Sequence, residues 1–334
     1  MDVDIFSYLR WAISTNLILD TSGILEDIFP KNEDLLQDLK KAGLKTDKLF
    51  VKKNYALIYR YLYEKTRTLS IKNQFFYRGV SKTDYKLVSG AYRRCGGLRE
   101  DEDFYFNAIQ IEYPKIFKDL SCVEKLTYMQ HYNCPTRLLD VTRNPLVALY
   151  FACSCNLNED GVVYLFSFAD EEVLLPQSLK IKTLANLAGL TENERHELAI
   201  QSYMSYENNK FSQTKNLKYT NNVIEKYFQF LNRTENIYER ALNPYDLLSP
   251  CVFQPYKDNP RLIKQDGAFI ISGLDFDEED SHQKIMNFVS DRFVIPADKK
   301  ELILQQLNRL GINESTLFPE IEHASNHLRN ISNM

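Results

Sequence analysis

The spacing of hydrophobic and polar residues predicts alternating helices and strands along the chain. Residues 1–66 repeat apolar side chains every three or four positions, which is typical of helices. Residues 71–80 form a short aromatic-rich run that ends at a glycine. Residues 162–168 form a nearly continuous apolar run after an Asp-Gly turn signal. Both runs predict buried strands.

Helical patterns return over residues 100–132 and over residues 146–155. The second helix follows Asn144-Pro145, since proline is tolerated in the first helical turn. Residues 136–141, between these helices, predict a short extended segment. The polar stretch 176–245 is helical in texture and poor in glycine, and we expect an insertion rather than a core element.

Strand patterns reappear at residues 262–272 and 293–295. A last helix is predicted over residues 299–310, because Gly311 stands where a helix C-cap belongs. Strands scattered between helices without a regular βαβ rhythm predict a mixed α/β (α+β) fold. We expect a helical region over residues 1–66 and one domain over residues 67–334.

Composition favours an ordinary globular protein of the cytoplasm. The N-terminal MDVDIFSYLR is acidic where a secretory signal needs a basic start. The apolar stretch 145–155 is about half of the roughly 20 residues that a membrane-spanning helix requires. Six scattered cysteines predict reduced thiols. His131 and Cys134 have half the spacing of a zinc site, but no second half follows, so we expect no metal.

The charge is distributed unevenly along the chain. Residues 40–94 hold fifteen Lys or Arg against three acidic residues, a net charge of +12 in a chain whose total is −4. Basic and acidic faces of one fold can neutralise each other. The alternative is a surface that attracts phosphates or nucleic acid.

Several common catalytic motifs are missing from the sequence. It contains neither GxGxxG nor GxxxxGK[ST], which cradle phosphates in many nucleotide-binding proteins. It also contains neither GxSxG nor HExxH. Rossmann dehydrogenases, P-loop enzymes, serine hydrolases and zinc proteases are therefore poor candidates.

Two segments carry polar residues in apolar surroundings. In the first, Tyr77-Arg78-Gly79, an arginine at the end of an apolar strand needs an anion, either a ligand or an internal carboxylate. The second is Gln130–Thr142, with the sequence QHYNCPTRLLDVT. If it is extended, Thr136, Asp140 and Thr142 share one face. Asp140 then either pairs with Arg78 or acts as an acid or base.

The ordered motifs YRG, QHYNCPTRLLDVTRNPLVALYFA, PRLIKQDGAF, FVIP and GINESTLFPEI resemble the signature of the FRG-domain family. The resemblance covers most of the chain after about Gln74. Asn133-Cys134 replaces the usual Gly-Leu before the proline, and Val141 replaces the usual Trp. Ligand preference is therefore expected to differ from that of relatives.

The motif order also resembles, distantly, that of ADP-ribosyltransferases, which implies a central split sheet flanked by helices and NAD as substrate. In this resemblance Tyr77, Arg78 and Gly79 hold the pyrophosphate of NAD. The nicotinamide side is shaped by Thr136 and Thr142, and Arg137 completes the site together with His131. The catalytic candidates are Asp140, His131 and Gln265. Gln265 stands where the family layout places a glutamate, so Asp140 or Asp266 has to supply the carboxylate.

Such an enzyme would suit a bacterial toxin or an antiviral (phage-defence) effector, with a protein or nucleic acid as its macromolecular target. A second hypothesis is a non-catalytic module that binds a nucleotide, a nucleic acid or a protein. A third is a hydrolase or nuclease that uses His131 with Asp140. Cys134 is expected to be a structural thiol, because no neighbour in the sequence activates it. The sequence leaves the target and the oligomeric state open.

Overall fold

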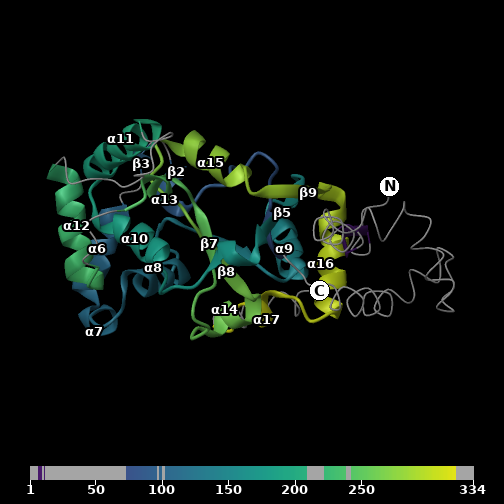
Figure 1. Ribbon diagram of the computed structural model, residues 1–334. Coiled ribbons are helices and arrows are strands. Elements are labelled where there is room, and N and C mark those ends of the chain that lie inside the picture. Colours follow the sequence, from purple (N-terminus) through teal and green to yellow (C-terminus); the bar gives the residue numbers. More distant parts are fainter. Residues whose placement is uncertain are drawn as a thin grey trace. The chain divides into compact units, whose positions relative to one another are not determined.

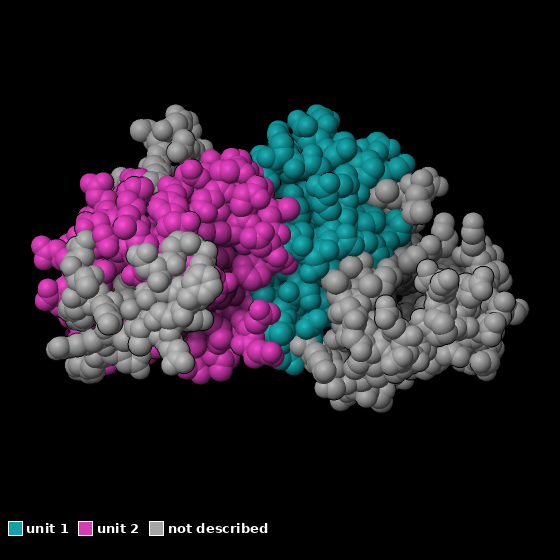
Figure 2. Space-filling view, turned by 45° about the horizontal axis from the view of Figure 1, so that its top comes forward, with its two compact units in different colours: residues 1–85, 142–170, 289–334 teal, residues 86–141, 171–288 magenta. Residues whose placement is uncertain are grey.

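A computed structural model describes residues 7–9, 11, 73–95, 98–99, 102–208, 222–237 and 242–320. The chain divides into two compact units (Figure 2). Unit 1 comprises Met1–Tyr85, Thr142–Asp170 and Val289–Met334, and unit 2 comprises Lys86–Val141 and Glu171–Phe288. The predicted helices of residues 1–66 lie outside the described part of the chain, apart from residues 7–9 and 11.

Unit 1 is built on antiparallel strands, and the three strands predicted here are confirmed. β1 (Asn73–Val80) pairs along its whole length with β5 (Gly161–Ala169), and β5 pairs with β9 (Val289–Ile295). On its other edge β1 contacts the end of β4 (Leu138–Thr142), where Tyr77 faces Thr142. β5 is buried along most of its length, as its apolar run predicts.

Helices cover one face of these strands. α9 (Pro145–Cys153) begins at Asn144, whose side chain accepts a hydrogen bond from the Leu146 amide, and it packs on β1. α16 (Lys300–Arg309) packs on α9, and α17 (Glu314–Leu317) follows it (Figure 1). The helices predicted over residues 146–155 and 299–310 are confirmed. Gly311 adopts a φ of +76°, the left-handed conformation expected after a helix.

Unit 2 is mainly helical. Its first helices, predicted over residues 100–132, are confirmed. α8 begins at Ser121 with a capping box that Glu124 completes. The helices of this unit are α6 (Glu102–Glu112), α7 (Pro114–Phe117), α8 (Cys122–His131), α10 (Leu179–Asn186), α11 (Glu192–Asn208), α12 (Asn222–Glu235), α13 (Pro244–Leu248), α14 (Pro260–Gln265) and α15 (Glu278–Met286).

The strands of unit 2 combine parallel and antiparallel pairing. β6 (Val173–Leu174) runs parallel to β7 (Cys251–Phe253), which runs antiparallel to β8 (Gly267–Ile271). A small hairpin joins β2 (Arg94–Cys95) to β3 (Leu98–Arg99). Together with the helices, these strands confirm the predicted mixed α/β class.

The prediction of one strand over residues 262–272 is wrong in its first half. The Asn259 side chain accepts a hydrogen bond from the Arg261 amide, and Pro260 follows at the first helical position, so the chain starts α14 here. Asp266 ends the helix in the left-handed conformation, with φ 44°, and only then does β8 begin. Gln265 therefore lies on a helix.

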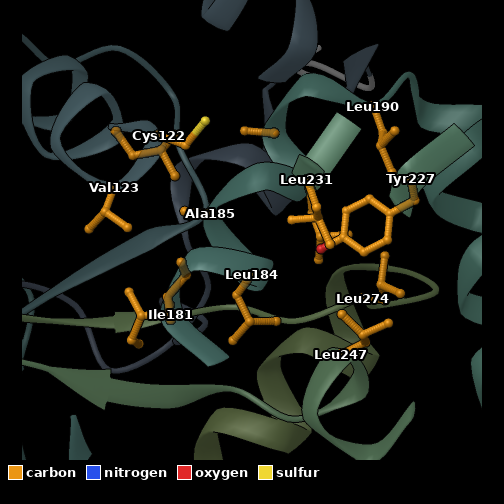
Figure 3. Packing of buried hydrophobic residues seen from close by; sticks show 14 of the residues in the cluster. Cys122, Val123, Ile181, Leu184, Ala185, Leu190, Tyr227, Leu231, Leu247 and Leu274 are labelled. Atoms are coloured by element: carbon orange, nitrogen blue, oxygen red, sulfur yellow. The ribbon is translucent and has the colours of Figure 1, made fainter. Parts of the chain in front are cut away.

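The helices of residues 176–245 form much of the core of unit 2, contrary to the expectation of an insertion outside the core. α12 buries an apolar stripe against α10 and α11. Figure 3 shows Tyr227 and Leu231 of α12 packed among residues from α8, α10 and α13. The helical content predicted for this stretch is confirmed. No helix in the described ranges is long and apolar enough to span a membrane.

Candidate functional site

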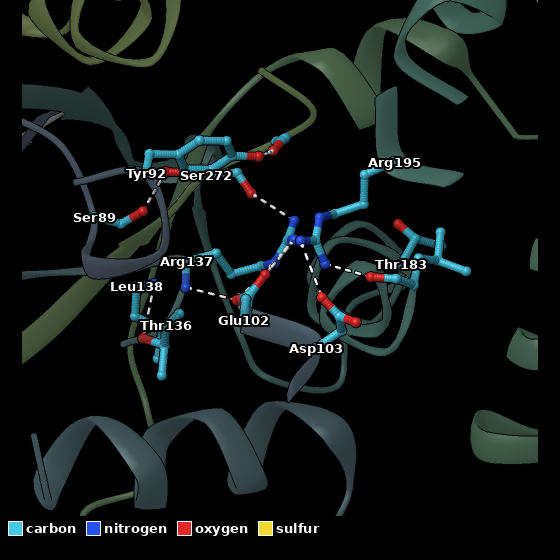
Figure 4. Close-up of polar contacts among 12 residues, drawn as sticks. Ser89, Tyr92, Glu102, Asp103, Thr136, Arg137, Leu138, Thr183, Arg195 and Ser272 are labelled. Carbon is cyan, nitrogen blue, oxygen red and sulfur yellow. Dashed lines mark hydrogen bonds and ion pairs between the residues drawn. The ribbon is translucent and has the colours of Figure 1, made fainter. Parts of the chain in front are cut away.

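Hydrogen bonds of its backbone hold the segment before β4 in place. The Thr136 carbonyl accepts a hydrogen bond from the Ala91 amide at 2.9 Å. The Arg137 carbonyl accepts one from the Ser272 amide, also at 2.9 Å. The Arg137 amide donates to the Glu102 carboxylate at 2.8 Å (Figure 4). These contacts fix the position at which β4 begins.

Arg137 forms a buried ion pair with Glu102. Its Nη2 lies 2.6 Å from Glu102 Oε2, its Nε donates to the same carboxylate, and the two side chains are 0% and 1% exposed. Burial alone would lower the pKa of Arg137, but the Glu102 carboxylate outweighs this effect and raises it. Arg137 thus has a structural role here, and its predicted contact with NAD stays a prediction.

A relay of hydrogen bonds leads from the buried Thr136 to the exposed Asp140. The Leu138 amide donates to Thr136 Oγ1 at 3.1 Å, and this hydroxyl donates to Gln130 Oε1 at 2.6 Å. Gln130 Nε2 then donates to Asp140 Oδ2 at 2.7 Å. We call Thr136, Gln130 and Asp140 the relay. Asp140 is the one exposed residue of β4, whose other residues are buried.

The relay is where sequence reasoning and geometry agree most closely. Thr136 and Asp140 were predicted to share a face of an extended segment, and Gln130 joins them from the last turn of α8. However, Thr136 is 0% exposed, so it reaches solvent only through Gln130. A carboxylate fixed by a hydrogen bond at the surface is ready to accept a hydrogen bond or to stabilise a positive charge.

His131, which follows Gln130 on α8, links this helix to α14. The His131 carbonyl accepts a hydrogen bond from Arg261 Nη1 at 3.3 Å. Gln265 lies one turn beyond Arg261, so the two side chains share a face of α14. The structure therefore brings the QHY and PRLIKQ motifs together in unit 2. Sequence reasoning missed Arg261 as a contributor, although its place four residues before Gln265 was a usable signal.

In unit 1 the YRG residues lie on β1. Tyr77 is buried against α9, and a Cβ on Gly79 would come within 1.8 Å of the Ala148 carbonyl oxygen. Gly79 is therefore required by the close approach of α9. Arg78 faces the opposite side of the strand from these two residues, opposite Tyr164 of β5, and is half-buried. The predicted roles of Tyr77, Arg78 and Gly79 toward NAD are left untested by this geometry.

Thr142 ends β4 and prepares α9. It is 5% exposed, and its Oγ1 accepts a hydrogen bond from the Asn144 amide at 3.0 Å. Cys134 is half-buried, and burial raises the pKa of its thiol, which disfavours a role as nucleophile. Across the residues that the structure describes, no group of three or more His, Cys, Asp or Glu could hold a metal ion.

Part of the chain resembles a known protein family. Residues 73–161 match the family model of the FRG domain. This range contains β1, the relay, α9 and the start of β5. No curated protein and no solved structure matches the chain.

Proposed function

Because the chain carries an FRG domain over residues 73–161, we propose that it uses the relay to bind NAD and transfer its ADP-ribose group. The observation that carries this proposal is the exposed carboxylate of Asp140, held by Gln130 in the middle of an otherwise buried strand. Polar groups that are fixed in advance at a surface serve recognition or catalysis more readily than mobile ones.

In this reaction the bond between the ribose C1′ and the nicotinamide nitrogen breaks. The nitrogen keeps the electron pair, so nicotinamide leaves as a neutral molecule and the positive charge passes to the ribose. A nucleophile on the target then bonds to C1′ and releases a proton. Asp140 stabilises the positive charge on the sugar and accepts a hydrogen bond from a ribose hydroxyl. Gln265, where the family layout places a glutamate, supplies no charge.

The test measures release of nicotinamide from NAD by the full chain. Asp140→Asn keeps the size of the side chain and removes its negative charge. We expect it to lower the rate at least tenfold, because loss of one preorganised charged group is typically worth ~10²-fold or more. Asp119→Asn, an exposed carboxylate of the same unit, is the matched control and should keep the wild-type rate. Equal rates in Asp140→Asn and wild type would refute the proposal.

A second candidate is a non-catalytic module that binds nucleic acid. The net charge of +12 over residues 40–94 favours it. Such binding weakens steeply as salt concentration rises, because counterions are released from the phosphates. Salt-dependent binding of an oligonucleotide, together with no release of nicotinamide by the wild type, would favour this second function.

A further inference from the structure

The direction of the hydrogen bonds in the relay is set by a backbone amide. An N–H group can only donate, so the Leu138 amide makes Thr136 Oγ1 an acceptor at 3.1 Å. The hydroxyl keeps one hydrogen, and Gln130 Oε1 lies 2.6 Å away to receive it. Thr136 is completely buried, so this hydrogen cannot turn to solvent instead.

The amide of Gln130 passes this direction on to Asp140. With Oε1 facing the hydroxyl, Nε2 must face the carboxylate, and it lies 2.7 Å from Asp140 Oδ2. The reverse orientation would place two acceptor oxygens against each other at this distance, unless Asp140 carried a proton. It would also leave the buried Thr136 hydroxyl without this acceptor. One orientation of the amide therefore satisfies all three groups.

We propose that Thr136 and Gln130 are positioning residues that act through Asp140 and present its carboxylate as a pure acceptor. The inference rests on the proposed function and narrows it. A carboxylate held in this way recognises hydrogen-bond donors and positive charge. Its ligand group is therefore a ribose hydroxyl, or the cationic ribose that forms when nicotinamide leaves. The carboxylate rejects phosphate oxygens, which are acceptors and carry negative charge.

This assignment changes the role of Thr136. In the resemblance to ADP-ribosyltransferases, Thr136 contacts the nicotinamide side of NAD. In the structure it is buried and reaches the surface through Gln130, so its effect on NAD has to pass through Asp140. A residue that acts through another shows a distinctive signature, because its removal has no further effect once the other is gone.

The test is a double-substitution experiment on release of nicotinamide by the full chain. Thr136→Val keeps the shape of the side chain and removes the hydroxyl. We expect a roughly twofold to tenfold loss of kcat/KM, the usual effect of one hydrogen bond between neutral groups. Thr136→Ser, which keeps the hydroxyl, should restore most of it. In an Asp140→Asn background, Thr136→Val should cause no further loss.

Thr127→Val is the matched control. Thr127 lies on α8, as Gln130 does, but its hydroxyl donates to the Val123 carbonyl one turn away rather than to the relay. Its substitution should leave kcat/KM unchanged. The inference is overturned if Thr136→Val behaves like Thr127→Val, or if the losses from Thr136→Val and Asp140→Asn multiply.

A readout that needs no NAD separates this inference from the proposed function. In the wild type, the side-chain NH₂ of Gln130 should give an NMR signal with slow hydrogen exchange, because one of its hydrogens is bound to Asp140. Thr136→Val and Asp140→Asn should each speed this exchange, and Thr127→Val should not. Slow exchange without release of nicotinamide would mean that the relay is correct and the transferase proposal is wrong. Fast exchange in the wild type overturns the relay itself.

Discussion

The ion pair between Glu102 and Arg137 is predicted to be the most sensitive point of unit 2. Both side chains are almost completely buried, and Glu102 accepts hydrogen bonds from the backbone amide, Nε and Nη2 of Arg137. Glu102→Gln leaves an acceptor for the amide but removes the charge that balances the guanidinium. We expect a loss of about 3–5 kcal/mol of unfolding free energy, the usual effect of leaving one buried charge uncompensated.

Removal of both charges should be much less harmful. In the double variant Glu102→Leu, Arg137→Met no buried charge remains, and the main loss is the acceptor for the residue 137 amide. One unsatisfied buried amide is worth about 1–3 kcal/mol. The double variant should therefore be more stable than Glu102→Gln, although it differs more from the wild type in composition. This order of stabilities distinguishes two cases. In one, each buried charge only compensates the other; in the other, the ion pair itself adds strongly to the stability of the fold.

The assay is urea unfolding followed by circular dichroism, combined with hydrogen exchange read separately for peptides of each unit. Exchange should accelerate in unit 2 peptides, including those that contain the Ser272 amide, which donates to the Arg137 carbonyl. Peptides of β5 in unit 1 serve as the internal reference. A loss below about 1 kcal/mol for Glu102→Gln, or a double variant less stable than the single one, would refute the reasoning.

Three further predictions concern unit 1 and the cysteines. Gly79→Ala should destabilise unit 1 by more than about 3 kcal/mol, because the new methyl meets the α9 backbone; Trp11 fluorescence in urea measures this. Lys300→Met should lower the same stability by about 2–4 kcal/mol, because the buried amine donates to three backbone carbonyls. With iodoacetamide at pH 8, Cys155 should react readily. Mass spectrometry should show little modification of the three thiols whose pKa is raised to about 12 by burial, Cys122, Cys153 and Cys251.

For each of these, one result would contradict the structural reason. A Gly79→Ala variant as stable as the wild type would contradict the predicted clash with α9. Gly311→Ala is the control: its methyl meets no atom, but φ is +76°, so we expect a loss of about 1 kcal/mol of stability. For Lys300→Met, the contradicting result is a urea unfolding curve, followed by Trp11 fluorescence, that matches the wild type. Labelling of Cys122 at the rate of Cys155 in the folded protein would show that burial does not protect the thiol.

Much of the fold could be predicted because its elements carry local signals. β1 and β5 follow from their apolar runs, and α9 follows from Asn144-Pro145, a cap and a first-turn proline. These signals depend on neighbours in sequence and do not need tertiary contacts. They are therefore visible in a single chain.

The two wrong predictions have identifiable physical causes. The polar composition of residues 176–245 concealed the stripe that α12 buries, although Val223, Tyr227 and Leu231 recur at helical spacing. In residues 262–272 the apolar pattern favoured a strand. The Asn-Pro start at Asn259 and the left-handed Asp266 cut a helix out of its first half.

The candidate site was predictable in its residue types but not in its connections. The sequence indicated that Thr136 and Asp140 share a face, and it marked Arg137 as a further site residue. It could not show that Arg137 forms an ion pair with Glu102, because the two residues are thirty-five positions apart in the sequence. The link from Thr136 through Gln130 likewise depends on how α8 packs beside β4.

The most direct test of the central claim is a calorimetric titration of NAD into the full chain, its Asp140→Asn variant and its Arg78→Ala variant. The account predicts that the wild type binds NAD and that Asp140→Asn binds it at least tenfold more weakly, because one charge-assisted hydrogen bond is lost. Loss of binding in Arg78→Ala would support the predicted contact between Arg78 and the pyrophosphate of NAD. Equal affinity of the wild type and Asp140→Asn, or no binding by the wild type, would contradict the account.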